Sequence, residues 1–326
     1  MNAAFINNIF NVLPDSFDAL ALQVYLFQVQ QNPLYSAFVK SILGNNPTVD
    51  SITKIPFLPI GFFKTHAVKT TAFESAAVFA SSGTTQTINS HHYIKEVEIY
   101  KRSFLQFFEE TYGNTSRWTI LALLPSYLER NNSSLVYMAD ELIRQSKKED
   151  SGFYLDEFDK LCATLKKLEQ NHQPAILIGV TFALLDFFEK YNIPLHHTIV
   201  METGGMKGRR KELTRQEVHQ FIKAKTGLKQ IHSEYGMTEL LSQAYSPGNG
   251  LFKTPEWMKV LVREEDDPLT VKATGRGVLN IIDLANIYSC SFIATDDAGT
   301  VYNDGSFEVI GRVDNTDIRG CSLLAV

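Results

Sequence analysis

The sequence predicts an α/β fold with a small antiparallel β subdomain after the main body. Two observations predict this fold class. From Ala77 onward, short apolar runs alternate with stretches of helical periodicity, which is typical of a sheet covered by helices. After about Trp257, short β-rich runs are separated by turn residues, which indicates antiparallel strands. We expect three parts: a helical segment packed on the body over 1–60, an α/β body over 61–255, and the β subdomain with a tail over 256–326.

The composition is that of a soluble globular protein and excludes several classes. The chain has 326 residues, 44% of them hydrophobic and 21% charged, with a formal net charge of −5 and no basic block that would favour nucleic acid. No apolar run approaches the roughly 18 residues that a membrane span needs. The first 39 residues lack Lys and Arg, so the charged start of a secretory signal is absent. Three scattered cysteines favour neither disulfides nor zinc, and we expect a cytoplasmic protein.

The amino-terminal part is expected to be helical over residues 1–45. Pro14-Asp15-Ser16 supplies a start signal, and an apolar face follows it, formed by Leu20, Leu22, Val24, Leu26 and Phe27. The later segment Ile55–Ile60 contains two prolines, which remove hydrogen-bond donors and fix φ. It is therefore predicted to be an extended connector.

The predicted elements of the body alternate along the chain. Strands are expected at Ala77–Ala80, Thr119–Leu124, Ala175–Gly179, Thr198–Met201 and Gln230–Ser233. Helices are expected at His92–Tyr112, Ser134–Gln145, Leu155–Glu169, Phe182–Tyr191 and Arg215–Lys225. In the subdomain, strands are expected at Val260–Val262, Gly277–Leu284, Phe292–Thr295, Thr300–Tyr302 and Phe307–Ile310.

Directly after the first of these strands, four hydroxyl side chains surround a glycine: Ser81, Ser82, Gly83, Thr84 and Thr85. Hydroxyls and free backbone N–H groups hold phosphate oxygens, and glycine permits their close approach. The segment lacks the lysine of a Gly-Lys-Ser/Thr phosphate loop. Two interpretations stay open, a phosphate-binding loop and an ordinary polar turn.

A second candidate segment follows the strand expected at Gln230–Ser233. Tyr235 offers a ring that stacks on a purine, Thr238 a hydroxyl for a phosphate, and Glu239 an oxygen ligand for Mg²⁺. The alternative is a strand-to-helix turn that Thr238 or Ser233 caps.

Two later segments carry the remaining polar candidates. Thr295–Gly299 has the composition of a hairpin turn, although an aspartate there also accepts hydrogen bonds from a ribose diol. Arg312 and Asp314 are either ligands or a surface ion pair.

Taken together and in this order, these segments resemble the motifs of the adenylate-forming superfamily of acyl-CoA ligases, luciferases and peptide-synthetase adenylation domains. Ser81–Thr85 is similar to its phosphate loop, although Gln86 stands where glycine is usual. Tyr235–Glu239 matches its Tyr-Gly-x-Thr-Glu motif at every fixed position. Thr295-Asp296-Asp297 matches its Thr-Gly-Asp with the glycine replaced, and Gly311–Asp314 matches its Gly-Arg-x-Asp.

Within that superfamily, the chain resembles the acyl-protein synthetases of the LuxE type. Three features carry this resemblance: Ile55–Ile60 leading into Phe62–His66, then Gly204–Gly208, and Arg319-Gly320-Cys321. The resemblance implies the large N-terminal body of the adenylate-forming fold without the usual C-terminal domain and its catalytic lysine. It also implies a reaction in which ATP and a carboxylic acid, expected to be a fatty acid, give acyl-AMP and pyrophosphate. The acyl group then passes to the thiol of Cys321.

The resemblance implies roles for individual residues, with ATP and Mg²⁺ as cofactors. The implied nucleotide-binding residues are Ser81, Ser82, Gly83, Thr84, Thr85, Gly204, Gly205, Tyr235, Gly236, Thr238, Asp297 and Arg312. Tyr235 would cover the adenine, and Glu239 would bind Mg²⁺. His66 is a candidate for orienting a carboxylate or acting as a base, with a structural hydrogen-bonding role as the alternative. Lys207, with Lys64 and Arg209 as alternatives, would neutralise the developing charge.

A partner protein is implied as well, because related synthetases pass their acyl group to a reductase or a carrier. Two alternatives to this function stay open. One is an acyl-CoA ligase of the phenylacetate type, with coenzyme A as the thiol acceptor. The other is a non-catalytic protein that binds a nucleotide or an acyl group.

Overall fold

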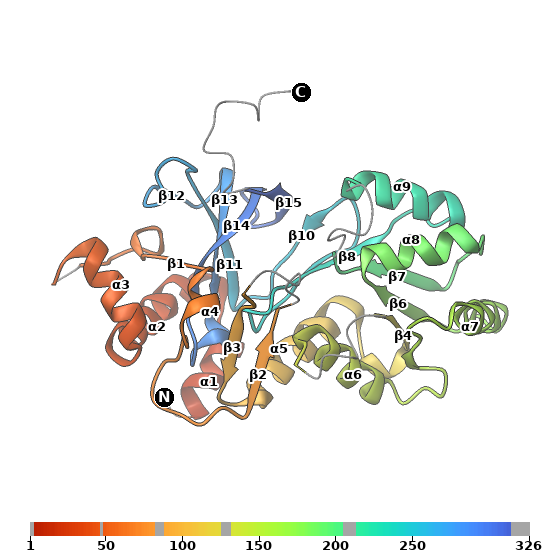
Figure 1. The fold of residues 1–326 in the computed structure, drawn as a ribbon, viewed down its shortest axis with the longest axis horizontal. Coiled ribbons are helices and arrows are strands. Elements are labelled where there is room, and N and C mark those ends of the chain that lie inside the picture. Colours follow the sequence, from red (N-terminus) through yellow and green to blue (C-terminus); the bar gives the residue numbers. More distant parts are fainter. Residues whose placement is uncertain (1–2, 46–47, 82–87, 125–131, 205–212, 314–326) are drawn as a thin grey trace.

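The computed structural model describes residues 3–45, 48–81, 88–124, 132–204 and 213–313. Several residues singled out above lie outside these ranges: Ser82, Gly83, Thr84, Thr85, Gly205, Lys207, Arg209, Asp314 and Cys321. Their roles therefore stay predictions. The described residues form two large sheets that lie side by side, with helices packed around them (Figure 1).

The body contains a six-stranded sheet in the order β5-β4-β6-β7-β8-β9. Its strands are β4 (Thr119–Leu123), β5 (Gly152–Phe153), β6 (Ala175–Gly179), β7 (Thr198–Glu202), β8 (His232–Tyr235) and β9 (Ala244–Ser246). Neighbouring strands are parallel except for β8 and β9. Most of the parallel neighbours are joined by crossover helices, as parallel pairing requires.

Helices cover both faces of this sheet. They are α5 (Val97–Tyr112), α6 (Ser134–Ser146), α7 (Phe158–Gln170), α8 (Thr181–Lys190) and α9 (Arg215–Thr226). Because side chains alternate along a strand, Ile120 and Ile176 share a core with α5, whereas Leu121 and Leu177 share a second core with α7, α8 and α9. The predicted strands and helices of the body are confirmed to within a few residues at their ends, with one exception.

The exception is the start of the helix predicted at His92–Tyr112, which is wrong. His91–Ile94 forms strand β3, which pairs with β2 (Ala77–Ala80), and the helix begins only at Val97. The strand forms because β2 supplies an antiparallel partner, with Phe79 opposite His92. The resulting hairpin lies near the middle of the molecule, beneath the antiparallel sheet in Figure 1.

The second large sheet has the order β10-β15-β14-β13-β11-β12. Its strands are β10 (Leu251–Phe252), β11 (Met258–Arg263), β12 (Val271–Lys272), β13 (Gly275–Asp283), β14 (Phe292–Val301) and β15 (Phe307–Arg312). The two strands predicted at Phe292–Thr295 and Thr300–Tyr302 are one continuous strand, so Thr295–Gly299 is not a hairpin turn. Neighbours on both sides hold this segment extended, and a register shift at Ala298 and Gly299 accommodates it.

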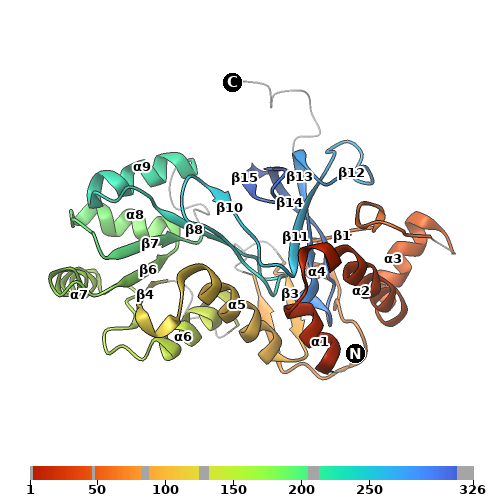
Figure 2. The same cartoon turned by 180° about the vertical axis from the view of Figure 1, so that it is seen from behind.

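The amino-terminal segment packs against this antiparallel sheet, as Figure 2 shows from behind. It consists of α1 (Ala3–Phe10), α2 (Phe17–Gln31), α3 (Pro33–Leu43), β1 (Leu58–Pro59) and α4 (Phe62–Thr65), with short 3₁₀ turns between them. The extended connector is confirmed, because Leu58 pairs in parallel with Ile293 of β14. The apolar face predicted for α2 is partly wrong: Leu26 is exposed and Gln28 is buried. No helix in the described part of the chain is long and apolar enough to cross a membrane.

Candidate active site

A cavity of about 410 Å³ lies where the carboxyl ends of β7 and β8 meet the β2–β3 hairpin, α4 and strands β14 and β15. Ligands of α/β proteins bind at the carboxyl ends of parallel strands, where loops rather than ladder bonds shape the surface. Among the predicted site residues, Ser81, Gly236, Thr238, Glu239, Asp297 and Arg312 line this cavity. Residues from four separate segments of the chain therefore meet at one place.

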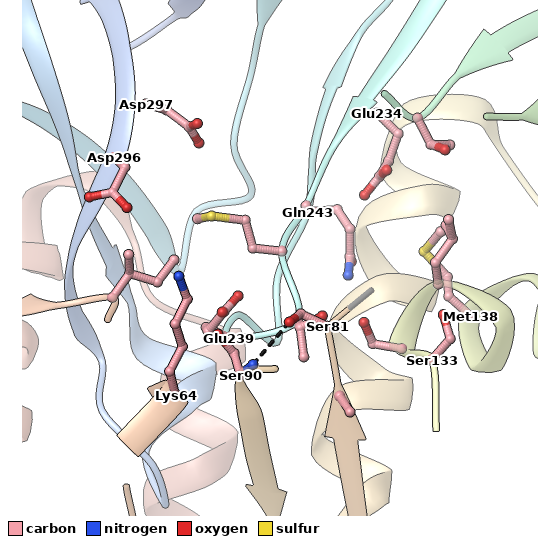
Figure 3. A pocket seen from close by; sticks show the side chains of 18 of the residues that line it. Lys64, Ser81, Ser90, Ser133, Met138, Glu234, Glu239, Gln243, Asp296 and Asp297 are labelled. Carbon is pink, nitrogen blue, oxygen red and sulfur yellow. Dashed lines mark hydrogen bonds between the residues drawn. The ribbon is translucent and has the colours of Figure 1, made fainter. Parts of the chain in front are cut away.

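Ser81 is the first residue of the predicted phosphate loop and directly follows strand β2 of the hairpin. Its backbone N–H donates to the carbonyl oxygen of Ser90 at 3.0 Å, and the Ser90 N–H donates to Ser81 Oγ at 2.9 Å. Figure 3 shows the second of these bonds at the floor of the cavity. Ser81, Ile88 and Ser90 all line the cavity.

Tyr235, Asp297 and Arg312 form a linked group across the two sheets. Asp297 on β14 lies opposite Arg312 on β15, with Arg312 Nε at 3.4 Å from Asp297 Oδ1. The Tyr235 hydroxyl, at the end of β8, donates to Asp297 Oδ2 at 2.7 Å, and the Tyr235 ring packs on Phe252 and Phe307. Burial and the Asp297 charge raise the pKa of Tyr235, so its hydroxyl stays a donor. The Tyr235 ring itself is not part of the cavity wall.

Glu239 supplies a nearly buried carboxylate to the cavity, with a side chain that is 6% exposed. Burial raises its pKa, against the opposing effects of a hydrogen bond with Ser90 and the positive charges of Arg312 and Lys64. Figure 3 shows Lys64 rising from α4 into the cavity beside Asp296 and Glu239. Of the three cations considered from sequence, Lys64 is the one within the described residues.

A buried histidine, His92, contacts the backbone at Thr238, next to Glu239. His92 Nδ1 lies 2.8 Å from the Thr238 carbonyl oxygen, and His92 Nε2 lies 2.9 Å from Asn286 Oδ1. The Asn286 side-chain amide in turn donates to the Glu239 carbonyl oxygen at 2.7 Å. Burial lowers the pKa of His92 to about 4, so the ring is neutral near pH 7. This segment is a bonded turn, not the start of a helix.

Glu202, the last residue of β7, fixes the backbone at Gly204 through a hydrogen bond. Glu202 accepts from the Gly204 N–H at 2.8 Å and from Arg215 Nε at 3.1 Å. Burial alone would raise the pKa of Glu202, but a bond from His219 and the charge of Arg215 lower it to about 2. Gly204 has φ +72, which favours glycine, but its neighbour Thr203 is the residue that lines the cavity.

His66 is placed differently from the other predicted residues. Its side chain is exposed, stacks on Phe62 and contacts Thr65 Oγ1 through Nδ1 at 2.8 Å. It is not among the residues that line the cavity. These contacts agree with the structural alternative, and a catalytic role for His66 stays a prediction without support from this geometry.

The motifs did not predict three other residues that line the cavity, Glu234, Gln243 and Tyr100. We call the part of the cavity that they line its inner end. Burial, with the nearby Glu202 charge, raises the pKa of Glu234 to about 8. The signal was present beside the recognised motif, since Glu234 precedes Tyr235, but an acidic residue at a strand end usually faces water. No cluster of three or more metal-binding side chains occurs within the described ranges.

Solved structures identify the class of fold. ATP-bound MatB from Rhodopseudomonas palustris matches with a TM-score of 0.55 and 15% identity, over 82% of this chain and 50% of that chain. A long-chain-fatty-acid-CoA ligase (FadD1) from Archaeoglobus fulgidus matches with a TM-score of 0.51 and 15% identity, over 72% of this chain and 51% of that chain. The predicted fold class is therefore confirmed, and the chain spans about half the length of these structures.

The family follows from a second comparison. The family model described as acyl-protein synthetase, LuxE, matches residues 15–325. Since this match covers nearly the whole chain, the protein belongs to the LuxE family of acyl-protein synthetases, as the motifs predicted. No curated protein sequence matches the chain.

Proposed function

We propose that this protein uses ATP to activate a carboxylic acid as acyl-AMP and then transfers the acyl group to its own Cys321. The observation that supports this most is the meeting of Ser81, Glu239, Asp297 and Arg312 in one cavity, from segments far apart in the chain. The fold shared with ATP-bound MatB supports a nucleotide as the ligand. The fold shared with the fatty-acid ligase agrees with an acid as the second substrate.

In the first step, a carboxylate oxygen of the acid attacks the α-phosphorus of ATP, and the bond to pyrophosphate breaks. The step brings two anions together in line, so positioning and charge neutralisation should contribute most of the rate acceleration. We propose that Asp297 binds the ribose hydroxyls, and that Tyr235 and Arg312 orient Asp297. Lys64 lies where its ammonium group would face the phosphates, and it is the cation of this cavity that best fits that role.

Mg²⁺ fits the donor set at Glu239. Magnesium is usually held by one or two carboxylates together with substrate phosphate oxygens, so a single cavity carboxylate suffices. When bound, the ion would neutralise phosphate charge. A cation beside Glu239 would also favour its ionised form, which burial otherwise disfavours.

In the second step, a thiolate attacks the acyl carbonyl carbon, and AMP leaves with the electron pair of the broken anhydride bond. Cys162 and Cys290 are poorly suited to this, since both are buried and burial raises the pKa of Cys290 to about 12. We propose that Cys321 is the acceptor and that it passes the acyl group on to a reductase or carrier protein.

The test is incubation with ATP, Mg²⁺ and a panel of radiolabelled carboxylic acids, with and without coenzyme A, and with pyrophosphate release, protein-bound label and labelled acyl-CoA measured together. Cys321→Ala should still release pyrophosphate in a first turnover, because acyl-AMP formation does not use the thiol, but it should carry no hydroxylamine-sensitive label. Cys162→Ala is the matched control and should be labelled like the wild type. Label that persists on Cys321→Ala would move the acceptor elsewhere. Labelled acyl-CoA would favour the acyl-CoA ligase alternative, and no product at all the non-catalytic one.

A further inference from the structure

The inner end of the cavity carries polar side chains that the proposed reaction does not use. Glu234 lies on β8, next to Tyr235, and Gln243 directly precedes β9, the antiparallel partner of β8. Both line the cavity, and Figure 3 shows their carboxyl and amide groups directed into it, away from the Lys64 side. Glu234 and Gln243 directly precede Tyr235 and Ala244, which pair with each other, so the backbone at both positions is fixed in place.

Several polar atoms here have no hydrogen-bond partner. Gln243 is 5% exposed, and its Oε1 has no partner within the described residues, while its Nε2 lies 3.5 Å from the Tyr100 hydroxyl. Thr203 Oγ1, on the same cavity wall, is also buried without a partner. Glu234 is 9% exposed, and within the described residues no hydrogen bond to its carboxyl group is found.

Such groups are rare in folded proteins, because a buried polar atom left without a partner destabilises the fold. Gln243 Oε1 is a hydrogen-bond acceptor, and the Glu234 carboxyl group keeps an acceptor oxygen whether or not it is protonated. Leu135, Met138 and Tyr100 supply apolar surface around them. A ligand that reaches this end would therefore bind more tightly if it carried a hydrogen-bond donor on an otherwise apolar chain.

The charges of the cavity are divided between its two ends. The cations of its described wall are Lys64 and Arg312. Figure 3 shows Lys64 on the side of Asp296 and Asp297, which we call the outer end, and Arg312 pairs with Asp297. The inner end has Glu234, with the charge of Glu202 acting on it. The described wall at the inner end holds no cation, so a second carboxylate or a phosphate on the far end of the substrate would have no positive charge to pair with there. A neutral or cationic substituent fits this end better.

We propose that the acid activated in this cavity carries a hydroxyl or an amine on its chain, and that Glu234 and Gln243 accept hydrogen bonds from that group. This inference rests on the proposed function, because it concerns the acid substrate of the same cavity. It makes Glu234 and Gln243 specificity-determining residues. A site built to bind a substrate donor discriminates strongly against the analogue that lacks it.

The experiment compares kcat/KM for pyrophosphate release with sets of acids of equal carbon number, short through long, that are unsubstituted or carry a terminal hydroxyl or amine. We expect the wild type to prefer a substituted acid at one chain length by about tenfold or more. Glu234→Leu and Gln243→Leu should each reduce that preference by about tenfold, mainly by weakening use of the substituted acid. Glu110→Leu, an exposed change on α5, is the control and should leave the preference unchanged.

Glu234→Gln separates the two substituents, because an amide still accepts from a hydroxyl but no longer balances an ammonium charge. For a hydroxy acid the preference should survive this change to within a few fold, whereas for an amino acid it should be lost. A wild-type enzyme that uses unsubstituted acids best at every length would overturn the inference while leaving the proposed function intact, and this result needs no folded variant. Absence of pyrophosphate with every acid would overturn both.

Discussion

Glu239 lies at the level of the cavity floor, where the cationic groups of Lys64 and Arg312 act on its charge. Its backbone carbonyl is fixed by Asn286 and that of Thr238 by His92, so the carboxylate projects from a rigid turn. A rigid carboxylate beside the phosphates is what electrostatic stabilisation of a reacting phosphate requires, because it needs no reorganisation during the reaction.

We expect Glu239→Gln to lower acid-dependent pyrophosphate release by about 10²-fold or more, since it removes a metal ligand at the reacting phosphates. The amide has nearly the same shape, so the melting temperature should change little. Stopped assays of pyrophosphate over a range of Mg²⁺ concentrations would measure this, with Glu110→Gln as the control. Full turnover in a folded Glu239→Gln protein would contradict the nucleotide assignment.

Glu234 gives a pH dependence of stability whose sign follows from its raised pKa. The group has a pKa of about 4.5 when exposed and about 8 in the folded protein, so between these values the folded chain holds a proton that the unfolded chain has released. The stabilising contribution is therefore present below pH 4.5 and is lost as the pH rises to 8. The titratable groups around Glu234 are Glu202 and the phenols of Tyr100, Tyr112 and Tyr245.

Glu234→Gln should accordingly gain stability relative to the wild type as the pH rises from 5 to 8, by on the order of 4 kcal/mol. Denaturant unfolding of both proteins at several pH values would measure this difference. Glu110→Gln should show no such trend. Parallel wild-type and Glu234→Gln curves would mean that Glu234 ionises freely in the folded protein.

At the scale of single residues, the sequence predicted those cavity-lining residues that belong to a motif of fixed spacing. Ser81, Glu239, Asp297 and Arg312 all line it. Glu234 and Gln243 were missed, although Glu234 directly precedes the motif, because their burial depends on β8 pairing with β9 and on the packing of α5.

Among the elements, α2 is hydrogen-bonded through the buried side chain of Gln28 to the segment that joins β13 and β14. Gln28 Nε2 lies 3.2 Å from the carbonyl oxygen of Asn286 and 3.0 Å from that of Ile287, and Gln28 Oε1 accepts from the Ser291 N–H at 2.9 Å. The turn that Gln28 contacts is the same one that presents Asn286 to the Glu239 carbonyl. The helix therefore supports the cavity from outside it.

Gln28→Leu should reduce the free energy of unfolding by about 2–4 kcal/mol, because it leaves several buried backbone groups unpaired. The matched control is Gln30→Leu, an exposed position on the same helix that should change stability by about 0.5 kcal/mol or less. Denaturant unfolding of the two variants would decide this. Equal stability of the two would show that water replaces the Gln28 bonds.

The elements that sequence predicted well are those with their own periodicity, such as α6 and β6. The incorrect predictions concern segments that are extended only because a neighbouring strand pairs with them. His91–Ile94 has too short a pattern to distinguish strand from helix, and Thr295–Gly299 has turn residues within a long strand. Both are extended because a neighbouring strand bonds to them.

At the scale of the whole molecule, the cavity lies between the six-stranded sheet and the antiparallel sheet, and Tyr235 and Asp297 bond across that junction. A ligand that contacts both sheets stabilises the folded state in proportion to its concentration over its dissociation constant. MgATP at about 100 times its dissociation constant should add about 2.7 kcal/mol. The melting temperature should rise by a few degrees.

Differential scanning fluorimetry with and without MgATP measures this increase. Asp297→Ala, which removes the proposed ribose ligand, should largely abolish the response. Lys259→Ala, on β11 and not among the residues that line the cavity, should retain it. An unchanged wild-type melting temperature at millimolar MgATP would contradict a nucleotide site in this cavity.

The bond between Gln28 and Asn286 joins residues 258 positions apart, and β1 pairs with β14 over a similar span. On the ribosome, the apolar face of α2 therefore emerges long before the strand that covers it. At about 5–20 residues per second, the interval is roughly ten to fifty seconds. During that time the nascent amino-terminal helices have no native surface to pack on, so protection by chaperones during synthesis should determine how much of this protein reaches its native state.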